Sequence, residues 1–132
     1  MAIAISLLLG ACASVMQSAT NDMASNLNAA IMNQNDPETV RDGAPAYLLM
    51  LDSFIEGSPG NAAMLSAAAE LYAAYGVIFV DDQQRADRLT RRSLGYGYQS
   101  LCASNKSACG IQDLSFRDFE DVLKKLERRD AP

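Results

Sequence analysis

The sequence predicts an all-α fold of four to five helices, arranged as antiparallel hairpins. Apolar residues recur at the three- and four-residue spacing of a helix along most of the chain. Capping residues, prolines and glycines mark the boundaries between these periodic segments. No segment carries a strong strand pattern of alternating apolar and polar residues. Because the connections are short, consecutive helices are expected to lie antiparallel.

The first two helices are predicted over residues 15–34 and from Pro37 to about Glu56. Asp36 precedes Pro37 and suits the N-cap position of the second helix, while proline suits its first turn. Pro45 lies inside the second helix and predicts either a kink near residues 41–43 or a short separate first turn. The residues expected to face inward are Leu48, Leu51, Phe54 and Ile55.

The turn GSPG at residues 57–60 separates the second helix from a third, which is predicted from Asn61 to about Val80. This helix is rich in alanine, so neighbouring helices can approach it closely. Its length and the Pro-Gly-Asn turn suggest hairpins of the tetratricopeptide type.

The fourth helix is predicted to begin with a capping box formed by Asp81 and Gln84. Its inner face is predicted from i, i+3 and i+4 spacing. That face comprises Ala86, Leu89, Ser93, Leu94, Gly97, Tyr98, Leu101 and Cys102, and the opposite face carries Arg85, Arg88, Arg91 and Arg92.

The last helix is predicted to have Ser115 as its N-cap and Asp118 as the matching acceptor, with Leu114 and Phe119 as a hydrophobic staple. Charge pairs four residues apart are expected between Glu120 and Lys124 and between Asp121 and Lys125. Its predicted buried face comprises Phe116, Phe119, Val122, Leu123 and Leu126.

The first eleven residues are uncharged and would span about 16 Å as a helix, roughly half of a bilayer's hydrocarbon core. The run has the length of a signal-peptide core. It ends in LGAC, which resembles a bacterial lipobox, so Cys12 is expected to be lipidated and residues 12–132 to form the domain. The basic start of a signal peptide is absent from this segment. The alternative is a short apolar helix packed on the domain, with Cys12 as a buried thiol.

Cys102 and Cys109 bracket a short polar segment. If Cys12 carries lipid, these two remain, and in an oxidising compartment they are expected to form a disulfide. Two free cysteines are the alternative. Two thiols without histidine do not make a zinc site, and the spacing differs from that of redox Cys-x-x-Cys motifs.

The composition argues against several classes of function. The chain contains no histidine, which removes the commonest general base and most zinc sites, so we expect neither an enzyme nor a metal or other cofactor. The net charge of −5 argues against a nucleic-acid surface.

Two segments resemble a known family. They are NDPETVRDGAPAYLLMLDSFIEGSPGNAAMLSAAAELYAAYGVIFV and RADRLTRRSLGYGYQSL. Both are similar to the T component of tripartite ATP-independent periplasmic (TRAP) transporters, the TatT family, and the resemblance covers roughly residues 20–130. Members continue past the point where this sequence stops, so we interpret the chain as a partial or short member.

The resemblance implies a tetratricopeptide-like envelope lipoprotein that faces the periplasm and can form a homotrimer. It further implies binding to the periplasmic solute-binding P component and a hydrophobic cleft for a small organic ligand. The alternative function is a general tetratricopeptide-like lipoprotein for envelope assembly, with no small-molecule role.

Candidate site residues are mainly aromatic or cationic. Core packing is the favoured interpretation of the aromatic side chains, and a ligand groove is the functional one. The groove candidates are Tyr47, Tyr72, Tyr75, Phe79 and Tyr98. Arg85, Arg88 and Arg92 are candidates for an anion or partner contact, with a solvated helix face as the alternative. Gly95 and Gly97 are interpreted as positions of close helix packing, and Asp81 and Asp82 as caps.

Overall fold

The computed structural model describes residues 22–23, 26 and 29–126. Residues 29–32 are helical and precede the first full helix. In chain order the elements then are α2 (Pro37–Gly57), α3 (Ala62–Ile78), α4 (Gln83–Ser104), the 3-10 turns η1 (Lys106–Ala108) and η2 (Ile111–Asp113), and α5 (Phe116–Leu123). The described residues contain helices and no strand, which confirms the all-α prediction. None of the helices in this part of the chain is long and apolar enough to cross a membrane.

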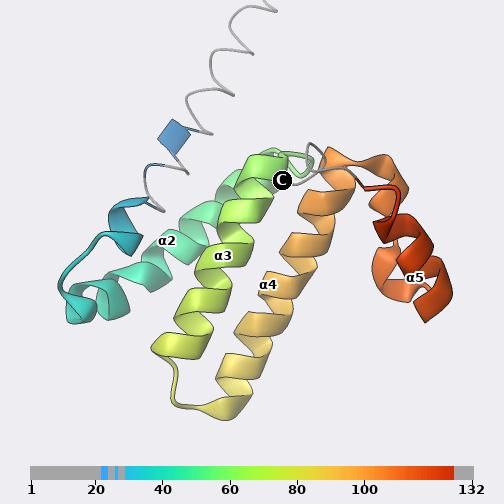
Figure 1. Cartoon of the computed structure of the whole chain (residues 1–132). Coiled ribbons are helices and arrows are strands. Elements are labelled where there is room, and N and C mark those ends of the chain that lie inside the picture. The colour runs from blue at the N-terminus through green and yellow to red at the C-terminus, as the bar shows by residue number, and fades with distance from the viewer. Residues whose placement is uncertain (1–21, 24–25, 27–28, 127–132) are drawn as a thin grey trace, which may run out of the picture.

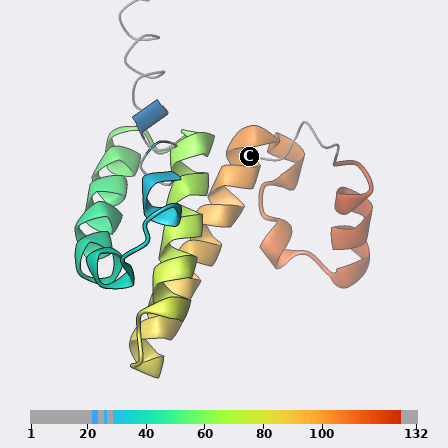
Figure 2. The same cartoon turned by 60° about the vertical axis from the view of Figure 1, so that its left-hand side comes forward.

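Helices α2, α3 and α4 lie side by side with alternating directions, and α3 is in the middle (Figure 1). Helix α3 packs against both neighbours, most extensively against α4. In the turned view, α5 stands apart from these three helices, beyond the end of α4 (Figure 2).

Hydrogen bonds confirm the predicted N-caps Asp36 and Ser115, and Asn61 is a third N-cap. Asp36 accepts from the backbone N–H of Glu38 at 3.1 Å, and Asn61 accepts from that of Met64 at 3.2 Å. The Ser115 hydroxyl oxygen accepts from the backbone N–H of Asp118 at 3.3 Å. Each cap satisfies one of the N–H groups that a helix start leaves without an intrahelical acceptor.

Pro45 lies inside α2 and does not end it. Proline has no N–H to donate to the preceding turn, so it weakens the helix locally. The ribbon of α2 changes direction in its first half (Figure 1), as expected from the predicted kink.

The core is centred on α3, which is apolar around most of its circumference because it is covered on two sides. Met64, Leu65 and Ala68 of α3 are fully buried, and Leu51 of α2 is nearly so. Gly76 lies where α3 meets α4. A Cβ atom at this position would lie 3.2 Å from the Cβ of Leu89, so a small residue permits the close contact.

The prediction for Gly95 and Gly97 was wrong. A Cβ atom at either position would meet no atom within 4 Å. The close helix contact is at Gly76, on the alanine-rich helix, where the sequence predicted an approach of neighbouring helices.

The predicted inner face of α4 was partly wrong. Leu94 is 56% exposed, whereas Tyr96 and Ser100 are buried. The Ser100 hydroxyl donates to the carbonyl of Ala62 at 2.8 Å, and that of Ser93 to Ala69 at 2.7 Å. Because these bonds satisfy the hydroxyl groups, polar residues of α4 can face α3. The face of α4 that contacts α3 is therefore rotated relative to the face that the apolar residues alone indicate.

The predicted capping box of Asp81 and Gln84 does not form the start of α4. Asp82, and not Asp81, is the N-cap, and its carboxylate accepts from the backbone N–H of Arg85 at 2.6 Å. The helix accordingly begins at Gln83. A cap is decided by the backbone conformation of one residue, which adjacent aspartates do not reveal in the sequence.

The buried face predicted for the last helix is not buried within the described part of the chain. Phe116 is 77% exposed, and every residue of α5 is at least partly exposed. The cap and apolar periodicity define a helix locally, but burial requires a second element to cover it. In place of the expected pairs, Lys124 lies 3.5 Å from Asp121.

Candidate functional site

An apolar groove of about 300 Å³ lies between α2, α3 and the residues that precede α2. Three segments separated in sequence form its walls, so it depends on the packing of α2 against α3. Its lining residues are Ile31, Met32, Gln34, Pro37, Val40, Ala44, Leu71, Ala74, Tyr75, Ile78 and Phe79.

Two aromatic side chains of α3 and its C-terminal end form one wall of the groove. The rings of Tyr75 and Phe79 are 5.9 Å apart and tilted by 36°. Met32 and Ile78 remain about two-thirds exposed, so the groove opens to solvent along an apolar rim. An apolar concavity of this volume is at the lower end of the range for small-molecule sites.

A smaller hollow of about 120 Å³ adjoins the groove on its α2 side. It shares Ile31, Gln34, Val40 and Ala44 with the groove and adds Tyr47. The two hollows therefore adjoin, and Tyr47 lines the smaller one while Phe79 lines the groove.

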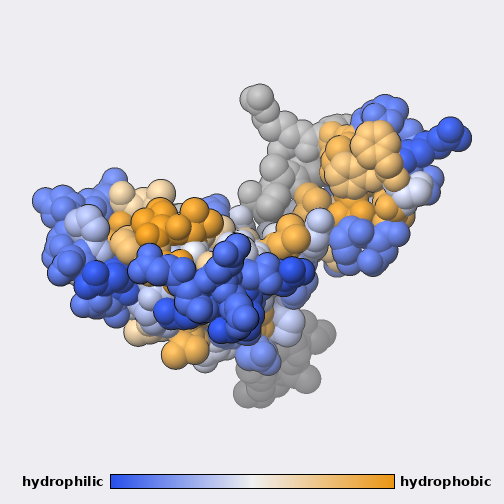
Figure 3. Space-filling model, turned by 90° about the horizontal axis from the view of Figure 1, so that it is seen from below, coloured by the Kyte–Doolittle hydropathy of each residue, from blue (hydrophilic) through white to orange (hydrophobic). Residues whose placement is uncertain are grey.

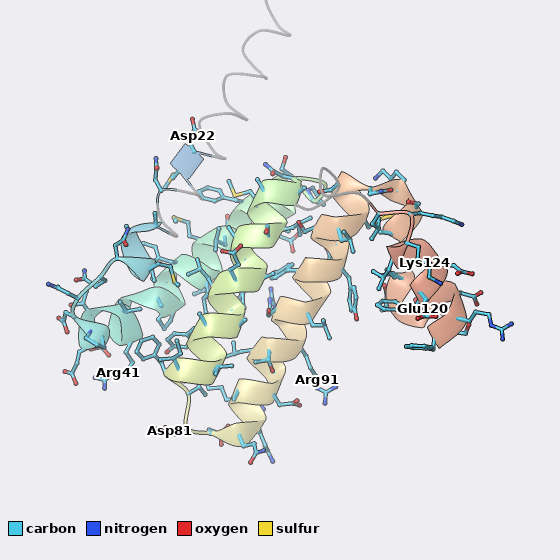
Figure 4. The ribbon with its side chains drawn as sticks, in the orientation of Figure 1. Asp22, Arg41, Asp81, Arg91, Glu120 and Lys124 are labelled. Atoms are coloured by element: carbon cyan, nitrogen blue, oxygen red, sulfur yellow. A yellow bond between two sulfur atoms is a disulfide. The ribbon has the colours of Figure 1, made fainter. Side chains whose placement is uncertain are left out.

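Arg85 and Arg41 differ in the groups that their guanidinium groups contact. The guanidinium carbon of Arg85 lies 5.7 Å from the centre of the Tyr75 ring, a cation–π arrangement. Arg41, by contrast, pairs with Asp42 at 3.1 Å and with Glu38 at 3.5 Å. Arg41 and Asp81 lie toward the same end of the molecule, where α3 ends and α4 begins (Figure 4).

Seen from this end, apolar surface over α2 and α3 is bordered by hydrophilic surface (Figure 3). A second apolar patch lies on α5, on the other side of the view. Among the exposed apolar residues, Ile78 lines the groove and Phe116 is on α5.

A polar network joins α2, α3 and α4 on another side of α3. Asp52 accepts from the hydroxyl of Tyr72 at 2.7 Å and from the hydroxyl of Tyr96 at 2.6 Å. The Nη2 atom of Arg92 donates to Asp52 at 2.8 Å, and its Nε atom donates to the Tyr96 hydroxyl at 3.2 Å. The guanidinium also lies 5.4 Å from the Tyr72 ring centre and 5.5 Å from that of Tyr96.

Burial, and then the hydrogen bond to Asp52, raises the pKa of both Tyr72 and Tyr96. Both hydroxyls therefore stay protonated and donate to the carboxylate at neutral pH. The Asp52 side chain is 18% exposed and accepts from three donors, so its charge is compensated inside the network. We interpret the network as structural, linking the three helices, because every polar group in it already has a partner.

The family model of the TRAP transporter T component matches residues 33–132. The chain belongs to the TRAP transporter T-component family. The family gives the T component a role in TRAP transport and an association with the transporter in the cell envelope, and it is a transport-associated family rather than one of enzymes. No curated protein and no solved structure gave a match.

The structure of this T component divides the predicted aromatic residues among four places. Tyr75 and Phe79 line the groove, and Tyr47 lines the adjoining hollow. The hydroxyl of Tyr72 instead donates to Asp52, so Tyr72 belongs to the Asp52 network. Tyr98 is partly buried on α4 and lines neither hollow.

The predicted cationic residues of the T component also separate. Arg92 belongs to the Asp52 network, whereas Arg85 lies over the groove residue Tyr75. Arg88 is exposed and makes no ion pair with a described residue. In the part of the chain that the structure describes, no group of three or more acidic, cysteine or histidine side chains gathers as it would around a metal ion.

Cys102, in the last turn of α4, and Cys109, which follows η1, are bonded to each other in this T component. Cys102 and Cys109 form a disulfide with their Cα atoms 4.5 Å apart, and it closes the segment that contains η1. Cys12, the candidate lipidation residue, lies outside the described residues.

Sequence reasoning missed Asp52 and most of the groove lining. Asp52 sits between Leu51 and Ile55, at the edge of the apolar face of α2, and that position was the available signal. Ile31, Val40 and Leu71 are ordinary apolar residues whose pattern predicts burial equally well in a core. Only the gap between segments makes them the wall of a groove.

Proposed function

We propose that this T component holds a small apolar organic ligand in the groove between α2 and α3 and serves TRAP solute uptake by binding the periplasmic P component. The observation that carries the proposal is the groove itself, an open apolar concavity of about 300 Å³ lined by Tyr75 and Phe79. Family membership supports the transport role. Burial of the apolar surface of a ligand would supply the binding free energy.

Ala74 gives a direct test of ligand holding. Ala74→Leu adds three carbons to the wall of the groove, whereas Ala63→Leu adds the same atoms at an exposed position of the same helix outside the groove. We expect medium-chain alcohols and acids to raise the melting temperature of the parent and Ala63→Leu proteins, and to do so much less for Ala74→Leu. Equal shifts in all three proteins would exclude the groove as the site.

Partner binding is tested separately. Recovery of the chain from native envelopes is expected to bring the P component with it, and its absence among the recovered proteins would argue against that part of the proposal. A protein that binds neither a ligand nor the P component would fit the alternative of a general assembly lipoprotein. Light scattering of the purified protein tests the homotrimer that the family resemblance implies.

We further propose that Cys12 carries the lipid anchor and that the helical domain faces the periplasm. Two or three acyl chains would hold the domain firmly at the membrane, whereas one would be marginal. Mass spectrometry of the N-terminal peptide from native cells tests this. An unmodified Cys12 preceded by the uncleaved apolar segment would contradict it.

A further inference from the structure

Helix α5 carries an apolar stripe that the other described helices leave open. Phe116 is 77% exposed and Leu123 is 45% exposed. Phe119 and Leu126 are partly exposed and lie on the same side of the helix, because they follow at three- and four-residue spacing. The backbone N–H of Leu126 donates to the carbonyl of Val122, so the helical path continues beyond the end of α5. The stripe therefore runs along the whole segment.

The segment between α4 and α5 holds the stripe away from the other helices. The disulfide of Cys102 and Cys109 joins the last turn of α4 to the residue that follows η1. Ala108 of η1 and Ile111 of η2 are buried. Helix α5 follows and stands apart from α2, α3 and α4 (Figure 2), and its apolar patch is open in the view of Figure 3. An apolar patch exposed in this way is typical of an interaction surface.

Charges border the stripe on both sides. At 3.6 residues per turn, Glu120 and Lys124 lie on one flank, and Asp118 and Lys125 lie on the other. Arg117 is a further cation near the start of the first flank. Residues 116–121 contain one cation and three anions, a net charge of −2, whereas residues 122–126 contain two cations and no anion, a net charge of +2. The segment is therefore acidic at its start and basic at its end.

Two copies of this segment complement one another when they lie antiparallel. Each flank then meets the same flank of the other copy in reverse order, so the acidic start lies beside the basic end. In this register Phe119 of one copy faces Leu123 of the other, and Phe116 faces Leu126. A parallel pair would bring start beside start and end beside end, so charges of the same sign would meet.

We propose that α5 is a contact surface between two copies of this chain, which pair through antiparallel α5 helices about a two-fold axis. The apolar stripe supplies the affinity, and the charge difference between the two ends sets the direction. The stripe is short, so the contact is a weak one that buries less surface than a stable dimer needs. A lipid anchor would strengthen it by concentrating the copies on one membrane. A two-fold contact differs from the three-fold contact of the homotrimer that the family resemblance implies.

Sedimentation equilibrium of the full chain, from micromolar to millimolar concentration, tests the apolar stripe. The parent protein is expected to form dimers as its concentration rises. Phe116→Ser combined with Leu123→Ser is expected to weaken this association by about tenfold or more, because both side chains leave water in the pair. The matched control combines Leu49→Ser with Val77→Ser, at positions 70% and 74% exposed on α2 and α3, and is expected to associate like the parent protein.

Charge exchange tests the direction of the pair. The acidic variant combines Lys124→Glu with Lys125→Glu, and the basic variant combines Glu120→Lys with Asp121→Lys. Asp118 remains, because its carboxylate belongs to the N-cap of α5. Each variant alone is expected to associate about tenfold more weakly than the parent protein, because charges of the same sign then meet. An equimolar mixture is expected to form mixed dimers at least as tightly as the parent protein, since opposite charges meet again.

Three results would each overturn the proposal. The first is a parent protein that stays monomeric at every concentration, and the second is an oligomer that the α5 substitutions leave unchanged. The third is a mixture of the charge variants that associates no better than either variant alone. Sedimentation with phosphatidylcholine–phosphatidylglycerol vesicles identifies the other occupant of this face. If a monomeric parent protein binds vesicles and the Phe116→Ser, Leu123→Ser protein does not, the stripe is a membrane surface. Circular dichroism melting shows whether each variant is folded, and the two sets of substitutions test the contact independently.

Discussion

Arg92 Nη2 lies 2.8 Å from Asp52 Oδ2 and thereby links two residues that are forty positions apart in the chain. Asp52 is on α2 and Arg92 on α4, while Tyr72 of α3 donates to the same carboxylate oxygen. The network therefore fixes the spacing of all three helices around α3. Since the groove is built between α2 and α3, its walls depend on this arrangement.

Replacing Asp52 with alanine is expected to lower the free energy of unfolding by about 2–3 kcal/mol, because three donors lose a charged acceptor and two of them are on buried tyrosines. Chemical denaturation measures this. The control is Asp87→Ala, which breaks the exposed pair with Arg91 at 2.8 Å and is expected to cost less than about 1 kcal/mol. Similar losses in the two variants would contradict a structural role for the Asp52 network.

Alkaline pH is expected to destabilise the protein through Tyr72. Its pKa is raised in the folded protein, so the stability it contributes is complete below the pKa of unfolded tyrosine, about 10. That contribution declines as pH rises above 10, because the unfolded chain releases the proton first. Tyr72→Phe should therefore show a smaller decrease in stability between pH 9 and 11 than the parent protein.

The correct cap of α4 can be distinguished by two adjacent substitutions. Asp82→Ala removes the 2.6 Å bond to the Arg85 backbone N–H and is expected to destabilise the protein by about 1 kcal/mol. Asp81→Ala is expected to change stability by less than about 0.5 kcal/mol. Thermal melts of the pair decide between the positions, and the reverse order of effects would show that the helix begins one residue earlier.

Two glycine substitutions separate helix propensity from packing. Gly97→Ala is expected to stabilise the protein by about 0.5–1 kcal/mol, because alanine favours the helix and its Cβ meets no atom within 4 Å. Gly76→Ala gains the same propensity but places a Cβ 3.2 Å from that of Leu89. It should therefore be less stable than Gly97→Ala by about 1 kcal/mol or more. Equal melting temperatures would show that α4 moves away from α3 at no cost.

The bond between Cys102 and Cys109 is expected to be present in protein purified from an oxidising compartment. Alkylation of the denatured protein before and after reduction, followed by mass spectrometry, counts the thiols. Replacing both residues with serine should cost at most about 2.5 kcal/mol, the value that chain entropy gives for so short a loop. Alkylation of both residues before reduction would contradict the disulfide.

The sequence determined the class of fold, the order of the helices and most of their ends. Asp36, Asn61 and Ser115 cap helices because a short polar side chain satisfies a neighbouring backbone N–H, and both partners lie within three residues. Periodicity likewise placed Leu48, Leu51 and Ile55 on the buried face of α2. Both signals are local, so a single sequence contains them.

Tertiary structure alone decided which faces were covered and where a site lies. Ser100 is buried and Leu94 is exposed because hydrogen bonds from hydroxyl groups of α4, such as that of Ser100 to the carbonyl of Ala62, set the rotation of α4 about its own axis. Phe116 is exposed because no described element covers it. The groove and the Asp52 network join residues far apart in the chain. Contacts of this kind depend on the angle and rotation at which helices pack. The apolar pattern of a helix defines only a broad face and leaves that geometry open.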